Sequence, residues 1–162
     1  MKIKEGEKLP EAEFFYLNEN NGVKTIDTKT LFANKKVILF GLPGAFTSTC
    51  SAKHLPGYVS HHESAKAKGV DQIICLSVND PNVMKAWGEE HSVGNKIFMI
   101  GDPYCIFTKL IGAEIDRMTR GLGMRSSRYT MLIENGVATK IKEESDAGMC
   151  EISAAENFLK EI

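Results

Sequence analysis

The chain has 162 residues, 43% of them hydrophobic, and its formal net charge is −1 because 20 basic residues nearly balance 21 acidic ones. This length suffices for a hydrophobic core without disulfide support, so we expect one domain over residues 1–162. The charge gives no electrostatic reason to expect a nucleic-acid partner, and no apolar run reaches the roughly 18 residues of a membrane span. The N-terminal segment lacks the apolar core of a signal peptide, so we expect a cytoplasmic protein without nucleic-acid or membrane partners.

The first half of the chain predicts strands at residues 13–17, 22–27 and 35–42. The first two, joined by the turn-rich NENN, are typical of a hairpin. The third, KKVILFGL, is a continuous apolar run, as expected of a strand buried on both faces. A helix is expected over residues 48–69, where Pro56 kinks or restarts it and Gly69 caps its C-terminus.

The second half alternates strands and helices. Strands are predicted at residues 72–78 and 96–101, helices at 79–91, 102–112 and 153–162, and a hairpin at 128–142. The hairpin turns at Asn135-Gly136, and the last helix is expected to begin at a Ser153/Glu156 capping box. The helix at 102–112 is expected to begin at Asp102.

Alternating strands and helices followed by a hairpin predict an α/β fold, with a mixed central sheet flanked by helices on both faces and an N-terminal β-hairpin. This arrangement is thioredoxin-like.

The four cysteines, Cys50, Cys75, Cys105 and Cys150, are far apart and form no CxxC pair. Without a secretory signal, this usage does not indicate a disulfide scaffold, and zinc-ribbon spacing is absent. A cysteine that does chemistry is therefore expected to act as an individual thiol.

Cys50 stands out because it follows the loop PGAFTST, residues 43–49, between a buried strand and a helix. Unpaired backbone N–H groups and the positive end of the helix dipole favour an anion there, and the anion of cysteine is the nucleophilic thiolate. The alternative is that Thr47 or Ser48 only caps the helix and Cys50 packs as a small apolar side chain.

The helix dipole alone does not supply enough free energy to keep Cys50 as a thiolate at pH 7. A thiol with the ordinary cysteine pKa of about 8.5 is only a few per cent thiolate at pH 7, and making it mostly thiolate takes about 3–4 kcal/mol. The dipole supplies at most about 2 kcal/mol. A charge-assisted hydrogen bond adds about 1.5–3 kcal/mol, so we expect a cation close to Cys50 in space.

The segment from Pro43 to Cys50 matches the peroxiredoxin signature P-x-x-x-T/S-x-x-C. The blocks GLPGAFTSTCSAKHLPGY, ICLSVNDPNVMKAWGEEH and RGLGMRSSRYTMLIENG resemble the type V/type II (atypical) peroxiredoxins in the same order. The resemblance runs from about residue 3 to residue 160.

This resemblance implies a thiol peroxidase that reduces hydrogen peroxide and alkyl hydroperoxides and needs no metal or organic cofactor. It assigns the peroxidatic role to Cys50, peroxide positioning to Thr47 and shielding of the thiolate to Pro43. It also nominates Arg128 as the required cation, whereas Arg125 could assist it or be an ordinary surface residue. It further implies a homodimer.

The step that recycles Cys50 stays open in the sequence. Cys75 lies in an apolar strand, where some relatives carry a second reactive cysteine, but it is more readily explained as a buried core residue. Cys150 lies near the region where animal relatives carry a resolving cysteine, with an offset of about two positions. Cys105 is expected to pack in the core. An external thiol, from glutathione with glutaredoxin or from thioredoxin, is therefore expected to reduce the oxidised Cys50.

Three other functions compete with the peroxidase. A disulfide oxidoreductase would need a CxxC pair. A redox sensor would use Cys50 to report oxidation to a partner and would consume one peroxide per thiol. A metal-binding module would use Cys50 with His54, four residues later on the same helical face, although His54 is more readily explained by structural hydrogen bonds.

Overall fold

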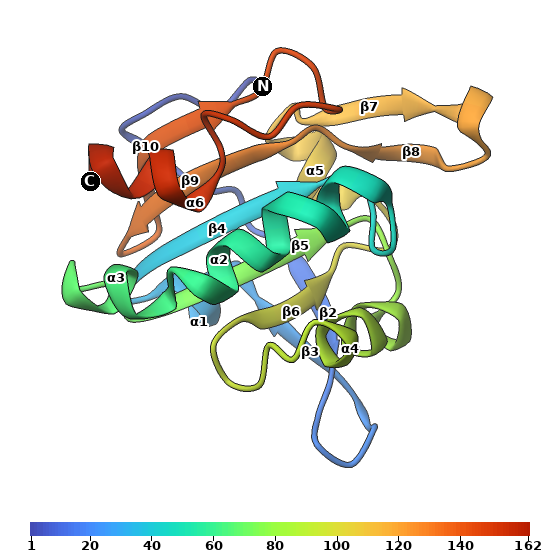
Figure 1. Ribbon diagram of the computed structural model, residues 1–162, viewed down its shortest axis with the longest axis horizontal. Coiled ribbons are helices and arrows are strands. Elements are labelled where there is room, and N and C mark those ends of the chain that lie inside the picture. The colour runs from blue at the N-terminus through green and yellow to red at the C-terminus, as the bar shows by residue number, and fades with distance from the viewer.

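The computed structural model describes residues 1–162 and contains one central sheet of eight strands. These are β1 (Glu7–Lys8), β2 (Glu13–Leu17), β3 (Val23–Asp27), β4 (Lys36–Leu42), β5 (Gln72–Ser77), β6 (Phe98–Gly101), β9 (Tyr129–Glu134) and β10 (Val137–Glu143). Across the sheet their order is β1-β10-β9-β4-β5-β6-β2-β3 (Figure 1). The central strands β4, β5 and β6 are parallel, and the others pair antiparallel.

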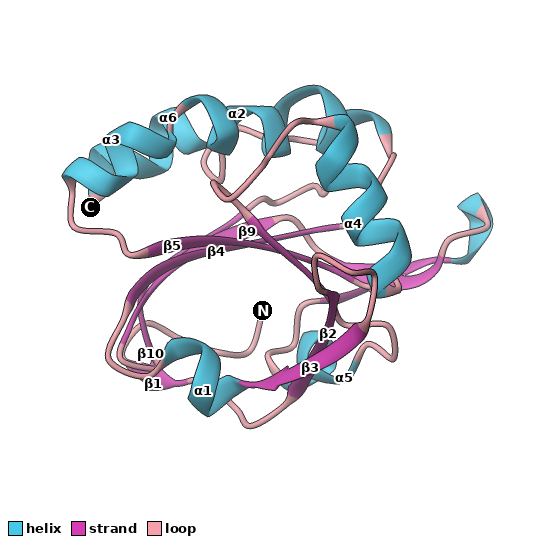
Figure 2. Cartoon of the chain, turned by 90° about the horizontal axis from the view of Figure 1, so that it is seen from below, coloured by secondary structure: helices cyan, strands magenta, loops and turns pink.

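The helices cover both faces of this sheet. They are α1 (Thr28–Phe32), α2 (Leu55–Ser60), α3 (His62–Ala67), α4 (Pro81–Glu90), α5 (Ile106–Leu110) and α6 (Ala155–Phe158). Figure 2 shows α2, α3, α4 and α6 on one face and α1 and α5 on the other. None of the helices has the length and apolar character needed to cross a membrane. The α/β class and the mixed sheet flanked by helices are confirmed.

The core has two halves because successive side chains of a strand point to opposite faces. Along β4, Ile38 and Phe40 join the core under α2 and α4, while Val37 and Leu39 join the core on the other face. All four side chains are fully buried. The continuous apolar run of this strand therefore has the cause expected from the sequence.

Both predicted hairpins are present. Strands β2 and β3 pair antiparallel, and β9 and β10 are joined by Asn135 and Gly136, which have φ values of +49° and +79°. Such left-handed values suit a tight two-residue turn, and Asn and Gly tolerate them best.

A second, two-stranded ribbon was not predicted. It consists of β7 (Glu114–Arg117), a short 3-10 turn (Met118–Arg120) and β8 (Gly123–Ser126). We call residues 114–126 the arm, because the ribbon extends away from the central sheet (Figure 1).

The helix predicted at residues 48–69 is divided. Cys50–His54 form a π-helical turn, in which Leu55 N–H donates to Cys50 O, and α2 and α3 follow with a break at His61. Pro56 lies in the first turn of α2, so the predicted restart is confirmed. The Pro56 ring has no N–H and cannot donate an α-helical hydrogen bond, and the wide π-helical turn comes directly before this part of the chain.

The helix predicted to begin at Asp102 starts later. Helix α5 begins at Ile106, after Cys105 in a left-handed conformation with φ +59°. Asp102 still serves the helix, because its carboxylate accepts the backbone N–H groups of Ile106 and Thr108. The aspartate therefore caps from four residues away, across an intervening turn.

The predicted Ser153/Glu156 capping box is wrong. Helix α6 begins at Ala155, and its N-cap, Ala154, makes no side-chain capping bond. The Ser153 hydroxyl instead donates to Glu144 Oε1 at 2.9 Å. The Ser153 side chain therefore bonds to Glu144, nine residues earlier, and does not cap the following helix.

Gly41 in β4 supplies a first test of this packing. A Cβ at this position would lie 2.3 Å from Cε1 of the Tyr129 ring, which is fully buried. We expect Gly41→Ala to lower the free energy of unfolding in urea by about 1–3 kcal/mol, because the ring cannot move without strain.

Gly57→Ala in α2 is the matched control. Its added methyl group would meet only Ala155 Cβ, at 3.9 Å. This change should stabilise the helix by about 0.8–1 kcal/mol. Equal unfolding free energies for Gly41→Ala and the wild type would contradict the packing described.

Candidate active site

Cys50 lies where the loop after β4 enters the π-helical turn, and its side chain is fully buried. Arg128 Nη2 donates a hydrogen bond to Cys50 Sγ over 3.1 Å. The required cation is therefore present, at the residue that the resemblance nominated. A guanidinium can only donate, so the sulfur is the acceptor in this contact.

Arg128 immediately precedes β9, which pairs with β4 through Gly41 and Tyr129. This neighbouring strand brings Arg128 to the loop that carries Cys50, 78 positions earlier in the chain. Only 2% of the Arg128 residue is exposed. Its Nε donates to Ala147 O at 3.0 Å, and its Nη1 donates to His54 Nδ1 at 3.1 Å. Buried charge is costly unless it is paired in this way.

His54 holds Arg128 in place through a defined tautomer. Its Nδ1 faces a guanidinium, which can only donate, and its Nε2 lies 3.2 Å from Ser153 O, which can only accept. The partners therefore assign the proton to Nε2. Burial lowers the pKa of His54 well below its ordinary value, and the charge of Arg128 lowers it further. His54 is neutral at pH 7, as an acceptor for Arg128 must be.

A buried polar network supports His54 from the C-terminal part of the chain. Ser153 O also accepts from Thr130 Oγ1 at 2.7 Å and lies 2.8 Å from the Tyr58 hydroxyl. Glu144 Oε1 accepts both the backbone N–H and the hydroxyl of Ser153. The sequence analysis missed the contribution of Thr130, Ser153 and Glu144, and only the i, i+4 spacing of Cys50 and His54 pointed to this region.

Thr47 and Pro43 form the wall of the site on the loop side. The Thr47 hydroxyl donates to Gly44 O at 2.7 Å, so its oxygen keeps lone pairs that can accept a hydrogen bond from a ligand. Pro43 is buried, and its carbonyl accepts from Arg125 Nη1 at 3.2 Å. The structure therefore brings Thr47, Pro43, Cys50 and Arg128 together.

Arg125 positions this loop. Its Nε donates to Leu122 O at 2.7 Å, so the guanidinium bridges the arm and Pro43. Burial lowers the pKa of Arg125, and the nearby charge of Cys50 opposes this shift. An added Cβ on Gly44 would lie 2.6 Å from Arg125 Nη1, so a glycine is needed for this approach. Of the two roles left open for Arg125, the geometry favours assistance.

None of the other cysteines accepts a hydrogen bond from a guanidinium. Cys75 is fully buried in β5, and burial followed by the charge of Cys50 raises its pKa well above the ordinary value. Burial also raises the pKa of Cys150, partly offset by Arg128, and the pKa of Cys105, to which Asp102 adds. All three are free thiols.

The side chains near Cys50 do not resemble a metal site. No three His, Cys, Asp or Glu side chains in the chain gather as potential metal ligands. Cys50 and His54, the two metal ligands considered in the sequence analysis, both accept a hydrogen bond from the guanidinium of Arg128. Its positive charge occupies the place that a metal ion would need.

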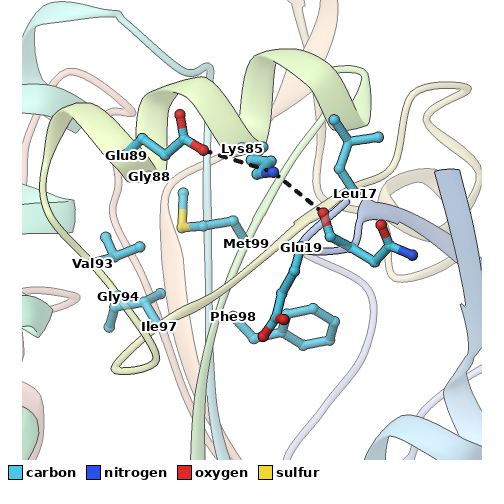
Figure 3. A pocket seen from close by; sticks show the side chains of 11 residues that line it. Leu17, Glu19, Lys85, Gly88, Glu89, Val93, Gly94, Ile97, Phe98 and Met99 are labelled. Atoms are coloured by element: carbon cyan, nitrogen blue, oxygen red, sulfur yellow. Dashed lines mark hydrogen bonds and ion pairs between the residues drawn. The ribbon is translucent and has the colours of Figure 1, made fainter. Parts of the chain in front are cut away.

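Two cavities differ in what they can do. A cavity of about 60 Å³ is lined in part by Pro43, Thr47 and Arg128, the residue that contacts Cys50. A larger cavity of about 280 Å³ lies between α4 and β6 and is lined by none of these residues (Figure 3). There Lys85 pairs with Glu89 and donates to Asn18 O, so its charge is already partnered.

Comparisons with known proteins agree with this geometry. A family model described as Redoxin matches residues 4–159. Peroxiredoxin-2B of Arabidopsis thaliana is 43% identical over 97% of this chain and 96% of its own length. The chain belongs to the peroxiredoxin family. Membership makes this protein a thiol peroxidase, an oxidoreductase, as the sequence resemblance implied.

Solved peroxiredoxin structures have the same fold. Reduced Prx3 of Vibrio vulnificus in complex with hydrogen peroxide is 45% identical, with a TM-score of 0.93 and 98% of each chain covered. An antioxidant protein of Plasmodium falciparum, described as a 1-Cys peroxiredoxin, is 34% identical, with a TM-score of 0.90 and 99% of this chain and 100% of that chain covered.

The buried neutral His54 of this peroxiredoxin makes its stability depend on pH. The folded state holds His54 with a lowered pKa, so below about pH 6.5 the unfolded chain binds a proton that the folded chain does not. Stability should therefore fall on acidification, by up to about 1.4 kcal/mol per pH unit.

Urea unfolding of the wild type and of His54→Gln at about pH 7.5 and pH 5.5 measures this effect. The glutamine does not titrate, so the drop at low pH should be smaller in the variant. An equal drop in both proteins would mean that His54 is not the group responsible.

Proposed function

We propose that Cys50 is the peroxidatic nucleophile of this peroxidase and that its substrates are hydrogen peroxide and alkyl hydroperoxides. The observation that carries the proposal is the 3.1 Å contact between Arg128 Nη2 and the buried Sγ of Cys50. Among the four thiols, Cys50 alone accepts a hydrogen bond from a guanidinium.

The first step is the attack of the Cys50 thiolate on one peroxide oxygen. The S–O bond forms as the O–O bond breaks, and the sulfur loses two electrons to the peroxide. The departing oxygen takes a proton and leaves as water or an alcohol. Cys50 remains as a sulfenic acid, the first product on the cysteine oxidation ladder.

Thr47 and Arg128 orient the peroxide for this attack. The Thr47 oxygen, with its own proton directed to Gly44 O, accepts a hydrogen bond from the peroxide O–H. The Arg128 guanidinium stabilises negative charge on the departing oxygen in a site shielded by Pro43. The cavity beside Arg128 is small, about 60 Å³, which suits the peroxide group itself.

Recycling proceeds through an external thiol, for which glutathione with glutaredoxin is the first choice and thioredoxin the second. The thiol sulfur attacks the sulfenic sulfur, an S–S bond forms, and water leaves. A second thiol then releases the Cys50 thiolate. The alternative is an intramolecular disulfide with Cys75 or Cys150.

Three observations support the external thiol. Raised pKa values keep Cys75 and Cys150 protonated at pH 7, whereas the attacking species must be a thiolate. Cys75 is also fixed in the sheet, between its neighbours Phe40 and Met99 on the adjacent strands. The similar Plasmodium falciparum protein is described as a 1-Cys peroxiredoxin.

The homodimer and the cytoplasmic location remain predictions. A second copy would find apolar surface on α5, where Ile106 and Leu110, four residues apart, are 51% and 52% exposed. Residues at this spacing lie on one side of a helix.

Two substitutions test the site. Cys50→Ser should abolish peroxide turnover and leave the circular dichroism spectrum unchanged. Arg128→Ala should slow Cys50 oxidation about 10- to 100-fold, because a charge-assisted hydrogen bond contributes about 1.5–3 kcal/mol. Thiolate ultraviolet absorbance at pH 7, corrected by that of Cys50→Ser, should fall in parallel.

Lys24→Ala, an exposed charge change on β3, is the control and should behave like the wild type. Residual turnover by Cys50→Ser would refute the nucleophile. Consumption of only one peroxide per wild-type chain, with reductant in excess, would favour the sensor instead.

Mass spectrometry after one equivalent of peroxide tests the recycling step. With glutathione present, we expect a mixed disulfide on Cys50 in the wild type, in Cys75→Ser and in Cys150→Ser alike. An intramolecular disulfide that forms quantitatively in the presence of glutathione, and disappears in one of the two variants, would overturn the external route.

A further inference from the structure

The mouth of the 60 Å³ cavity carries two arginines that the peroxidase chemistry does not use. Arg117 and Arg120, both on the arm, line it together with Pro43, Thr47 and Arg128. Arg117 ends β7 and is partly buried, and Arg120 is exposed in the 3-10 turn that follows. The arm thus adds two positive charges at the point where a molecule approaches Cys50.

Neither guanidinium has a partner within the chain. The hydrogen bonds and ion pairs of the structure include no side-chain contact of Arg117 or Arg120. Arg125 and Arg128, by contrast, each donate to at least two acceptors. The nearby carboxylates are directed elsewhere, since Asp116 accepts from Met118 N–H and Asp146 from Gly148 N–H.

We propose that Arg117 and Arg120 form a subsite for a carboxylate on a molecule that reacts at Cys50. The proposal rests on the proposed function and deepens it, because it names a chemical feature of the ligand. A guanidinium presents its donors in a planar fork that matches a carboxylate, and two unpaired guanidinium groups at one opening favour an anion over a neutral ligand.

The dimensions of the cavity place the carboxylate outside the reacting centre. About 60 Å³ accommodates the peroxide or thiol group and little more, so the rest of a larger ligand extends toward the arm. There the ligand meets Arg117 and Arg120 before it meets Arg128. The carboxylate can be part of an organic hydroperoxide or part of the reducing thiol, and both share the same chemistry at the arm.

Matched pairs of acid and methyl ester separate charge from shape. For the peroxide, the probes are linoleic acid hydroperoxide and its methyl ester, with trapping of the Cys50 sulfenic acid by dimedone as the readout. For the thiol, the probes are mercaptopropionate and its methyl ester, with formation of the mixed disulfide on previously oxidised Cys50 as the readout. In each protein the measured quantity is the ratio of the acid rate constant to the ester rate constant.

We expect this ratio to fall about threefold in Arg117→Gln and in Arg120→Gln and about tenfold in the double variant, as partly exposed ion pairs contribute up to about 1 kcal/mol each. The difference should shrink as salt rises, because dissolved ions screen the attraction between solvent-exposed charges. Lys66→Gln on α3, an exposed charge change of the same kind, is the control and should leave the ratio at the wild-type value.

A ratio that falls for the peroxide pair alone assigns the carboxylate to the peroxide, and a fall for the thiol pair alone assigns it to the reductant. A fall for both pairs means that one subsite serves both molecules. Unchanged ratios for both pairs in the double variant overturn the subsite. Failure of the proposed function looks different, because wild-type Cys50 would then form no sulfenic acid with either the acid or the ester.

Discussion

The contact between Arg128 and Cys50 is the interaction on which the rest of the site depends. A guanidinium with 2% of its residue exposed must have its N–H groups satisfied, and here they go to a sulfur, an imidazole and a backbone carbonyl. Each acceptor comes from a different position along the chain: Cys50, His54 and Ala147. The Cys50 sulfur is therefore both the reactive atom and one of the hydrogen-bond acceptors that stabilise the buried charge of Arg128. Stability and reactivity are coupled at this single atom.

The C-terminal segment takes part in the same coupling, although it carries no group that touches a ligand. Glu144 fixes Ser153, and the carbonyl of Ser153 accepts hydrogen bonds that define the positions of His54 and Thr130. His54 in turn presents its lone pair to Arg128. A neutral imidazole suits this position, because a protonated one would place a second buried cation beside the guanidinium. Through these hydrogen bonds, residues of the sheet and of the C-terminal segment together fix the position of the Arg128 guanidinium.

The sequence predicted what depends on local or strongly periodic signals. Continuous apolar runs predicted strands β4 and β5, and the loop before Cys50 indicated that this cysteine is the candidate reactive thiol. The arm gave no signal, because EIDR and GMRS lack alternation and are not part of the main core. The Ser153 prediction failed because Glu144, nine residues earlier, outcompetes a local cap. The structural hydrogen bonds expected for His54 are present, but the partners of His54 and Arg125 could not be predicted, since they lie 74 and 82 positions away.

The burial of Cys50 sets different demands for the two halves of a catalytic cycle. A peroxide group fits the 60 Å³ cavity, whereas a larger thiol must extend from the cavity toward the arm. Oxidation also changes the charge at the site, because the neutral sulfenic acid gives up the charge that Arg128 stabilises in the thiolate. The local backbone is strained as well. The π-helical turn at Cys50–His54 and the left-handed φ of +63° at Phe46 are conformations that hold only while the surrounding contacts are intact. The hydrogen bond from Arg128 to Cys50 Sγ is one of the contacts that hold this strained segment in place.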